Sequence, residues 1–251
     1  MAALQFKEIR VMTDKYTCRI NKDLGFDIKL QEGVFQPTGT SDEIIKAVSS
    51  NIQSPGKLLD LGCGSGVVGF ALHILGKTQG PICASDLSND AISLIKENAK
   101  DLGIPVISRA GSIFEPWLDE SFDYVVDDIS GIAERVAEIS PWFSATSCTS
   151  GEDGTDLVLE AISNAPAHLN EGGKFFFPVL SLSDSNKIVR FANSTFQKVT
   201  KIGHKEWRLP DEMEEHIDML SDLKAQGLIN FEEKYGWLLW STDVYMAELP
   251  R

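Results

Sequence analysis

The sequence is poor in the residues that build metal centres and disulfide frameworks, and it lacks long apolar runs. Its four cysteines and four histidines are scattered along 251 residues, without the short spacing typical of metal ligands. We therefore expect no metal site, and reduced thiols rather than disulfides. No segment approaches the about 18 to 20 apolar residues of a membrane-spanning helix, and the first residues are too charged for a signal peptide. These absences predict a cytoplasmic protein without a membrane segment.

Positive charge is also scarce. The chain has 37 Asp and Glu against 23 Lys and Arg, a formal net charge of −14, and two segments hold much of the excess. Residues 111–160 contain twelve acidic residues and one arginine, and residues 211–236 contain eight acidic residues and two lysines. Nucleic-acid binding needs clustered Lys and Arg, so this distribution disfavours nucleic acid and favours a cationic or neutral substrate. A plain solubilising surface is an equally good explanation.

What the sequence does contain is a regular alternation of apolar and amphipathic segments. Apolar runs predict strands at 56–62, 81–86, 104–110, 122–129, 172–180, 196–209 and 236–249. Amphipathic runs predict helices at 66–76, 88–103, 153–170 and 184–195. Such alternation builds a mostly parallel sheet with helices on both faces, and the last two strands, without a helical crossover between them, are expected to pair antiparallel. The predicted fold is α/β: a doubly wound, seven-stranded sheet of the Rossmann type.

Two segments fall outside this alternation. Residues 1–32 predict a small N-terminal hairpin that covers a sheet edge or a ligand cleft, and the main domain is expected over 33–251. Within it, residues 209–236 predict a helical insertion before the last strand, because apolar residues such as Met213 and Ile217 recur there at helical spacing. A substrate contact and a plain lid or dimer surface are equally consistent with this insertion.

The most informative segment is the turn after the first strand of the main domain, DLGCGSG from Asp60 to Gly66. Glycines let a backbone turn sharply and approach a ligand without Cβ atoms in the way, and the helix that follows begins with unpaired N–H groups. Glycine-rich turns also occur in dinucleotide-binding proteins. Asp60 disfavours that alternative, because its carboxylate would repel a pyrophosphate and attract an ammonium group.

An acidic residue followed by three alternating glycines resembles motif I of the class I S-adenosylmethionine-dependent methyltransferases. The resemblance implies S-adenosyl-L-methionine as cofactor, with Asp60 beside its amino-acid part. The cofactor would lie on the turn residues Gly62, Cys63, Gly64 and Gly66. Asp86, at the end of the next strand, takes the position whose carboxylate accepts both ribose hydroxyls. A helix cap is the alternative for Asp86.

Between about residue 33 and residue 181 the chain is similar to the release-factor glutamine N5-methyltransferases and related small-domain enzymes. This similarity implies that Leu87, Ser112 and Ile113 border the adenine of the cofactor. The family usually has an aspartate at the position of Ser112, so the contact with the adenine amino group is weaker here.

The sequence departs from those enzymes after the fourth strand. They carry N-P-P-Y there, a rigid turn that accepts the N–H groups of a planar amide, whereas this chain has D-I-S-G from Asp128 to Gly131. Asp128 keeps an acceptor and adds a charge, so we expect it to border the cofactor and act as catalytic base or partner of a cationic amine. Trp142 and Phe143 are expected to wall a substrate pocket over it. Strand alternation turns Asp127 away or lets it cap the next helix.

The predicted function is therefore an S-adenosylmethionine-dependent methyltransferase that acts on a nitrogen or oxygen of a small molecule or protein side chain. The loss of N-P-P-Y motivates one alternative, a catalytically silent cofactor-binding relative that works as an interaction partner. A nicotinamide-dependent oxidoreductase is a third class. The sequence leaves the oligomeric state open.

Overall fold

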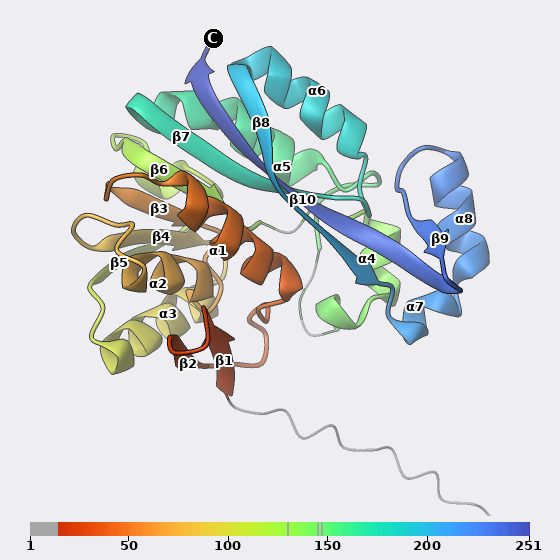
Figure 1. Ribbon diagram of the computed structural model, residues 1–251, viewed down its shortest axis with the longest axis horizontal. Helices are drawn as coiled ribbons and strands as arrows, with labels where there is room; N and C mark the ends of the chain where they lie inside the picture. The colour runs from red at the N-terminus through yellow and green to blue at the C-terminus, as the bar shows by residue number, and fades with distance from the viewer. Residues whose placement is uncertain (1–14, 130, 145, 147) are drawn as a thin grey trace, which may run out of the picture.

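The computed structural model describes residues 15–129, 131–144, 146 and 148–251, and its centre is one twisted sheet (Figure 1). The strands of this sheet are β3 (Leu58–Leu61), β4 (Ile82–Asp86), β5 (Val106–Ala110), β6 (Phe122–Asp127), β7 (Leu169–Leu180), β8 (Phe196–Arg208), β9 (Glu232–Lys234) and β10 (Trp237–Pro250). Their order is β5-β4-β3-β6-β7-β10-β8, with β9 paired to β10. Strands β3 to β7 run parallel, and β10 is antiparallel to both β7 and β8. The predicted fold class and the antiparallel end of the sheet are confirmed.

Helices cover both faces of the sheet. They are α1 (Gly39–Asn51), α2 (Val67–Ile74), α3 (Asn89–Leu102), α4 (Glu134–Ile139), α5 (Asp156–Asn164), α6 (Ser185–Thr195), α7 (Asp211–Glu214) and α8 (Ile217–Ala225). Three short 3-10 helices, η1 (Glu115–Trp117), η2 (Pro141–Phe143) and η3 (Ala165–His168), complete the set within the described residues. The helix expected over 153–170 is shorter than predicted, because η3 and the start of β7 take up its last residues.

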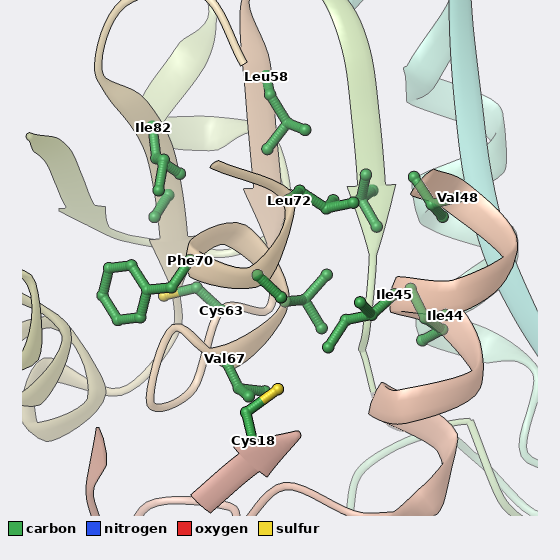
Figure 2. Packing of buried hydrophobic residues seen from close by; sticks show 14 of the residues in the cluster. Cys18, Ile44, Ile45, Val48, Leu58, Cys63, Val67, Phe70, Leu72 and Ile82 are labelled. Carbon is green, nitrogen blue, oxygen red and sulfur yellow. The ribbon is translucent and has the colours of Figure 1, made fainter. Parts of the chain in front are cut away.

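Side-chain alternation along the strands divides the interior into two cores. In β7, Phe176 packs with α1 and α2 on one face, whereas Phe175 and Phe177 pack with α5 and α6 on the other. Leu58 and Leu59 of β3 are divided in the same way. Figure 2 shows side chains of α1, α2 and β3 meeting in the first core. Strands buried on both faces explain why their sequences are almost continuously apolar.

The insertion contributes a strand as well as helices, which corrects the predicted count of seven strands. Lys234 pairs with Trp237 across a two-residue turn in which Tyr235 has φ 57° and Gly236 has φ 79°. Two consecutive residues with positive φ form the turn type that suits a tight hairpin. In the helical part, Met213 is buried as expected, whereas Ile217 is exposed.

The N-terminal hairpin consists of β1 (Lys15–Arg19) and β2 (Gly25–Lys29); residues 1–14 of the predicted extension lie outside the described residues. The hairpin packs on α2 and α3 and not along an edge of the main sheet. Phe26 meets Phe70 of α2 with ring centroids 6.5 Å apart, and the backbone of Lys29 exchanges hydrogen bonds of 2.8 and 3.2 Å with the Asn98 side chain. Cys18 lies beside Val67 in the same core (Figure 2).

A membrane-spanning helix needs about 20 mostly apolar residues, and among the described residues no helix combines the length and the apolarity that this requires.

Candidate functional site

A cleft lies where the strand order of the sheet reverses. Strand β3 lies between β4 and β6. From β3 the chain adds β4 and β5 on one side of the sheet, and then β6 and β7 on the other side. Open α/β sheets bind ligands in the crevice beyond the carboxyl ends of such strands. Here a cleft of about 510 Å³ is lined by the ends of β3, β4 and β6 and by the segment before α1. Among the predicted site residues it is lined by Gly62, Cys63, Gly64, Asp86, Leu87, Ser112, Ile113, Asp128 and Phe143. Gly66 is not among the lining residues, which corrects its predicted cofactor contact: a Cβ there would lie 2.5 Å from the Phe70 ring and 2.7 Å from the Ile95 side chain, so this glycine makes room for helix packing.

The glycine turn is held by hydrogen bonds to the end of the neighbouring strand β4. Gly62 and Cys63 donate to the Ser85 carbonyl at 2.9 and 3.0 Å, and Gly64 donates to Asp86 Oδ2 at 2.9 Å. The turn therefore offers a ligand close approach to a backbone without side chains. It does not offer these three donors. Cys63 is buried, and burial raises the pKa of its thiol, so it is not a reactive cysteine.

Asp60 does not reach the cleft, which corrects its predicted contact with an ammonium group. Its side chain is fully buried, and Oδ2 accepts a 2.9 Å bond from the Gly69 N–H in the first turn of α2. A Cβ at Gly69 would lie 2.7 Å from that oxygen, so this glycine makes room for Asp60 and not for a ligand. Burial raises the pKa of Asp60 well above its usual range. Asp60 therefore fixes the start of α2 beneath the glycine turn.

Asp86 stabilises the backbone around it and also lines the cleft. One carboxylate oxygen accepts from Gly64 N–H and the other from Ser88 N–H, each at 2.9 Å. The cap of α3 is Ser88, whose hydroxyl accepts from Ala91 N–H at 3.3 Å. Because each carboxylate oxygen has two lone pairs, both oxygens of Asp86 retain an acceptor site. The geometry is compatible with the predicted binding of a vicinal diol.

Asp86→Ala is expected to weaken binding of S-adenosylhomocysteine by about 1.5 to 3 kcal/mol, the usual range for lost hydrogen bonds to a charged group. Titration calorimetry measures this change. Asp86→Asn, which keeps one acceptor oxygen, should lose less. Because the substitution also frees the Gly64 and Ser88 N–H groups, the thermal midpoint must be recorded for both variants. Affinity equal to that of the parent would contradict the ribose assignment.

The far wall of the cleft is apolar. Leu87 is 74% exposed although it borders the cleft, so a flat ligand there would cover an otherwise hydrated leucine. Ile113 is buried and has φ 46°, a left-handed conformation that is uncommon for a β-branched residue. Its neighbour Ser112 lines the cleft and donates its backbone N–H to Glu115 Oε2 at 3.1 Å. The three residues predicted to border an adenine thus lie together.

Asp128 stands at the inner end of the cleft, directly after β6. Its N–H donates to the Leu61 carbonyl at 3.0 Å, which ties the residue to β3. Its Oδ2 accepts a 2.8 Å bond from the hydroxyl of Ser41, in the first turn of α1. Burial raises the pKa of Asp128 to about 7, although the Ser41 hydrogen bond opposes the shift. Asp128 is therefore poised to exchange a proton near neutral pH.

A second, smaller cavity of about 40 Å³ opens next to Asp128. Its walls are mostly aromatic and aliphatic. They comprise Phe35, Thr38, Thr40, Asp128, Ile129, Gly131, Ile132, Trp142, Phe143, Pro178, Leu180 and Trp240. Phe35, Asp128, Ile129 and Phe143 line this cavity and the large cleft alike. Asp128 therefore stands at the junction between the two spaces.

The predicted pocket residues Trp142 and Phe143 both border this small cavity, on η2. Trp142 contacts Trp240 with ring centroids 5.1 Å apart, and Phe143 contacts Phe35 at the same separation. Sequence reasoning did not identify Phe35, Trp240 or Ser41, which lie far from Asp128 in the chain. Phe35 and Ser41 fall within the segment that resembles the methyltransferases, and only that resemblance pointed to the region.

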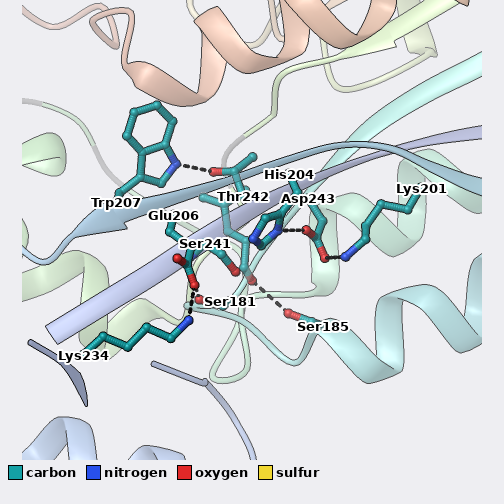
Figure 3. Close-up of polar contacts among 11 residues, drawn as sticks. Ser181, Ser185, Lys201, His204, Glu206, Trp207, Lys234, Ser241, Thr242 and Asp243 are labelled. Carbon is teal, nitrogen blue, oxygen red and sulfur yellow. Dashed lines mark hydrogen bonds and ion pairs between the residues drawn. The ribbon is translucent and has the colours of Figure 1, made fainter. Parts of the chain in front are cut away.

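The floor of the small cavity is fixed by hydroxyl groups. Thr40 Oγ1 and Thr242 Oγ1 lie 3.0 Å apart, and Thr242 Oγ1 also accepts a 3.1 Å bond from the indole of Trp207 (Figure 3). The start of α1 lies against the same tryptophan, since a Cβ at Gly39 would lie 2.4 Å from its ring. This network holds the first turn of α1, and with it Ser41, in place beside Asp128.

Asp127 is buried below the site and does not line either cavity. Its Oδ1 accepts a 2.8 Å bond from Ile129 N–H, so it stabilises the turn that follows β6 and does not cap α4. Its Oδ2 is buried without a partner in the described part of the chain. Burial raises the pKa of Asp127 to about 8.

Asp127→Asn is expected to make the protein more stable above pH 7 and to flatten the pH dependence of its stability. An unfolded aspartate has a pKa of about 3.9, whereas burial raises the pKa of Asp127 to about 8 in the folded state. Between these values the folded state binds the extra proton, so the free energy of unfolding falls as pH rises, by up to about 1.4 kcal/mol per pH unit. Asparagine mimics the neutral acid. Thermal unfolding of both proteins from pH 5 to 9 measures the slopes, and equal slopes would contradict the assignment.

Comparison with known proteins assigns the chain to a family. Residues 52–207 match the methyltransferase domain family. The release factor glutamine methyltransferase of Geobacter sulfurreducens is 28% identical over 164 residues, 59% of this chain and 54% of that protein. The ribosomal protein L11 methyltransferase of Lactobacillus johnsonii is 27% identical over 153 residues, 60% of this chain and 40% of that protein. The chain thus spans about half the length of the curated relatives it matches.

Solved structures show the same fold. The ribosomal protein L11 methylase of Lactobacillus delbrueckii subsp. bulgaricus aligns with a TM-score of 0.52 at 18% identity, over 86% of this chain and 81% of that one. The 16S rRNA N2 G1207 methyltransferase of T. thermophilus, solved with AdoMet and guanosine, aligns with a TM-score of 0.60 at 13% identity, over 94% of this chain and 50% of that one.

The glycine turn, the Asp86 carboxylate and the apolar wall lie together at the switch point of the sheet, where open α/β sheets bind their ligands. The chain belongs to the methyltransferase domain family. The resemblance drawn from motif I and its neighbours is confirmed at the level of this family.

Proposed function

We propose that the protein is an S-adenosyl-L-methionine-dependent methyltransferase, and that the nitrogen or oxygen atom of the substrate that it methylates lies beside Asp128. The observation that supports this proposal is the position of Asp128 at the junction of the two cavities. Asp128 lines a cleft large enough for a nucleoside cofactor and also a small cavity with aromatic walls. The relatives named for release factor glutamine and ribosomal protein L11 favour a protein side chain as acceptor, and a small molecule with the same functional group is the alternative.

The residues of the cleft fit the cofactor. A Cβ at Gly64 would meet only the Phe35 carbonyl, at 3.5 Å, so the turn leaves open the space a ligand needs. Asp86 would hold the ribose, while Leu87, Ser112 and Ile113 would border the adenine. When bound, S-adenosyl-L-methionine supplies an electrophilic methyl group. The protein then has to direct an acceptor lone pair at that methyl group and take up a proton, and Asp128 is placed for both tasks.

Substrates with a polyanionic backbone fit the protein poorly. The net charge is −14, and no Lys, Arg or His is among the described residues that line the two cavities. We therefore expect a protein or small-molecule acceptor and no nucleic acid.

The test is transfer of a labelled methyl group from S-adenosyl-L-methionine to a cell extract that is then separated into protein, RNA and small-molecule fractions. Label in the protein or small-molecule fraction supports the proposal, and label confined to RNA overturns the acceptor class. Calorimetry with S-adenosylhomocysteine accompanies the assay. Cofactor binding without transfer to any fraction would favour a catalytically silent relative.

A further inference from the structure

We infer that the small cavity beside Asp128 is a subsite for an alkylammonium group, so that the methyl acceptor is a primary amine at the end of an alkyl chain. The inference rests on the proposed function and narrows its acceptor from any nitrogen or oxygen to an amine. The size of the cavity, the chemistry of its walls and the absence of the N-P-P-Y turn all favour an amine.

The size of the cavity selects a slender group. A volume of about 40 Å³ holds about three water-sized groups, since one needs at least about 10 to 15 Å³ measured in this way. The last atoms of an alkylammonium chain fit this space. A nucleobase or another ring does not fit without a change in the walls.

The walls suit a cation. Four of the residues that line the cavity are aromatic: Phe35, Trp142, Phe143 and Trp240. Aromatic faces attract ammonium groups, most strongly where water is excluded. Asp128 is the single charged residue among those that line the cavity in the described part of the chain, so its carboxylate would be the counter-ion. An aromatic enclosure with one carboxylate favours a cation over a neutral or anionic group.

An amide is the main competitor. It would have to be held by two acceptors for its N–H groups, as in the N-P-P-Y turn, whereas Asp128 Oδ2 already accepts from Ser41. One feature favours the amide: the indole Nε1 of Trp240 is buried without an acceptor in the described residues, and an amide carbonyl would satisfy it. The experiment must therefore separate amine from amide.

Asp128 can take up the proton that an alkylammonium group must lose before it accepts a methyl group. The ammonium first gives one proton to the Asp128 carboxylate and becomes a neutral amine. Its lone pair then forms the new N–C bond while the C–S bond of the sulfonium breaks and its electron pair passes to sulfur. The products are S-adenosylhomocysteine and a secondary ammonium, and the proton leaves Asp128 to solvent. Burial holds the pKa of Asp128 at about 7, and the nearby Asp60 and Asp127 have raised pKa values for the same reason.

Binding of small probes tests the subsite without turnover. Methylammonium chloride, acetamide and methanol are titrated at matched ionic strength into the protein saturated with S-adenosylhomocysteine, and ligand-observed NMR measures their affinities. We expect methylammonium to bind at least about tenfold more tightly than either neutral probe. Asp128→Asn should weaken methylammonium about tenfold, and Trp142→Leu about fivefold. Trp237→Leu, a tryptophan outside both cavities, is the matched control and should change nothing.

The outcomes separate the inference from the function on which it rests. Equal or tighter binding of acetamide, or unchanged methylammonium binding in Asp128→Asn, overturns the amine assignment. Affinity for S-adenosylhomocysteine shows that each variant is folded. If Trp142→Leu is not folded, Trp142→Met replaces it, because methionine also lacks an aromatic face, and the same loss is expected. Mass spectrometry of the labelled product gives a second readout: methyl on an amine nitrogen supports the inference, and methyl on an amide nitrogen or an oxygen overturns it alone. Absence of label in every fraction overturns the proposed function instead.

Discussion

Asp128→Ala is expected to lower the rate of methyl transfer by about 10²-fold or more while the affinity for S-adenosylhomocysteine changes little, because general base catalysis contributes about this much. The alanine variant has neither the proton acceptor nor the charge at the junction of the two cavities. Asp128→Asn retains an acceptor oxygen for Ser41 and should lose less. Steady-state transfer assays on the identified substrate, together with calorimetry, measure the two effects separately.

The pH dependence gives the control for this prediction. If the Asp128 carboxylate takes up the proton, kcat/KM of the parent enzyme rises with pH through about 7, where burial sets the pKa of this group. This rise of kcat/KM with pH should be absent in Asp128→Asn. It should persist in Asp127→Asn, because the Asp127 side chain lines neither cavity. A parent-like rate in Asp128→Ala would contradict the catalytic role of Asp128. The residues around Trp142 and Phe143 would then be the next candidates.

Most of the fold could be predicted from the sequence because the longer strands of the main sheet carry their own signal. Residues such as Leu58, Leu59 and Phe175 to Phe177 are apolar without interruption, since alternate side chains enter two different cores. Connections of helical length between them then fix parallel pairing. Strand β9 was missed because it is only three residues long and acidic. Its place in the sheet depends on the tight turn at Tyr235 and Gly236, which a search for apolar runs does not detect.

The cleft was predictable where its residues lie at the end of a strand or soon after it. Gly62, Gly64, Asp86 and Asp128 all line the cleft because strand ends converge there. The role expected for Asp60 was wrong: a residue inside a strand points into the core, and here it bonds the start of α2. Ser41 and Trp240 come from α1 and β10, and their distance from Asp128 in the chain leaves no local pattern. Such contacts depend on how the layers pack.

Gly64→Val is expected to reduce the affinity for S-adenosylhomocysteine by about 10²-fold or more while the protein stays folded. Gly64 has φ 49°, and the space beside it is open apart from the Phe35 carbonyl at 3.5 Å. A valine side chain would therefore occupy the cleft. The left-handed conformation costs about 1 to 2 kcal/mol for a residue with a Cβ. Gly227→Val, at an exposed glycine with φ 78° and open surroundings, is the control for that strain and should bind normally.

Gly62→Val should instead damage the fold, although both glycines belong to the same turn. Its Cβ would lie 2.8 Å from the Ile129 side chain and 3.2 Å from the Ile129 backbone, in the turn that presents Asp128. Overpacking of this kind costs about 1 to 3 kcal/mol, in addition to the strain of a positive φ of 73°. We expect a lower thermal midpoint for Gly62→Val than for Gly64→Val. Normal cofactor binding by a folded Gly64→Val protein would mean that the ligand does not lie on this turn, because the valine would then fill a space that no ligand uses.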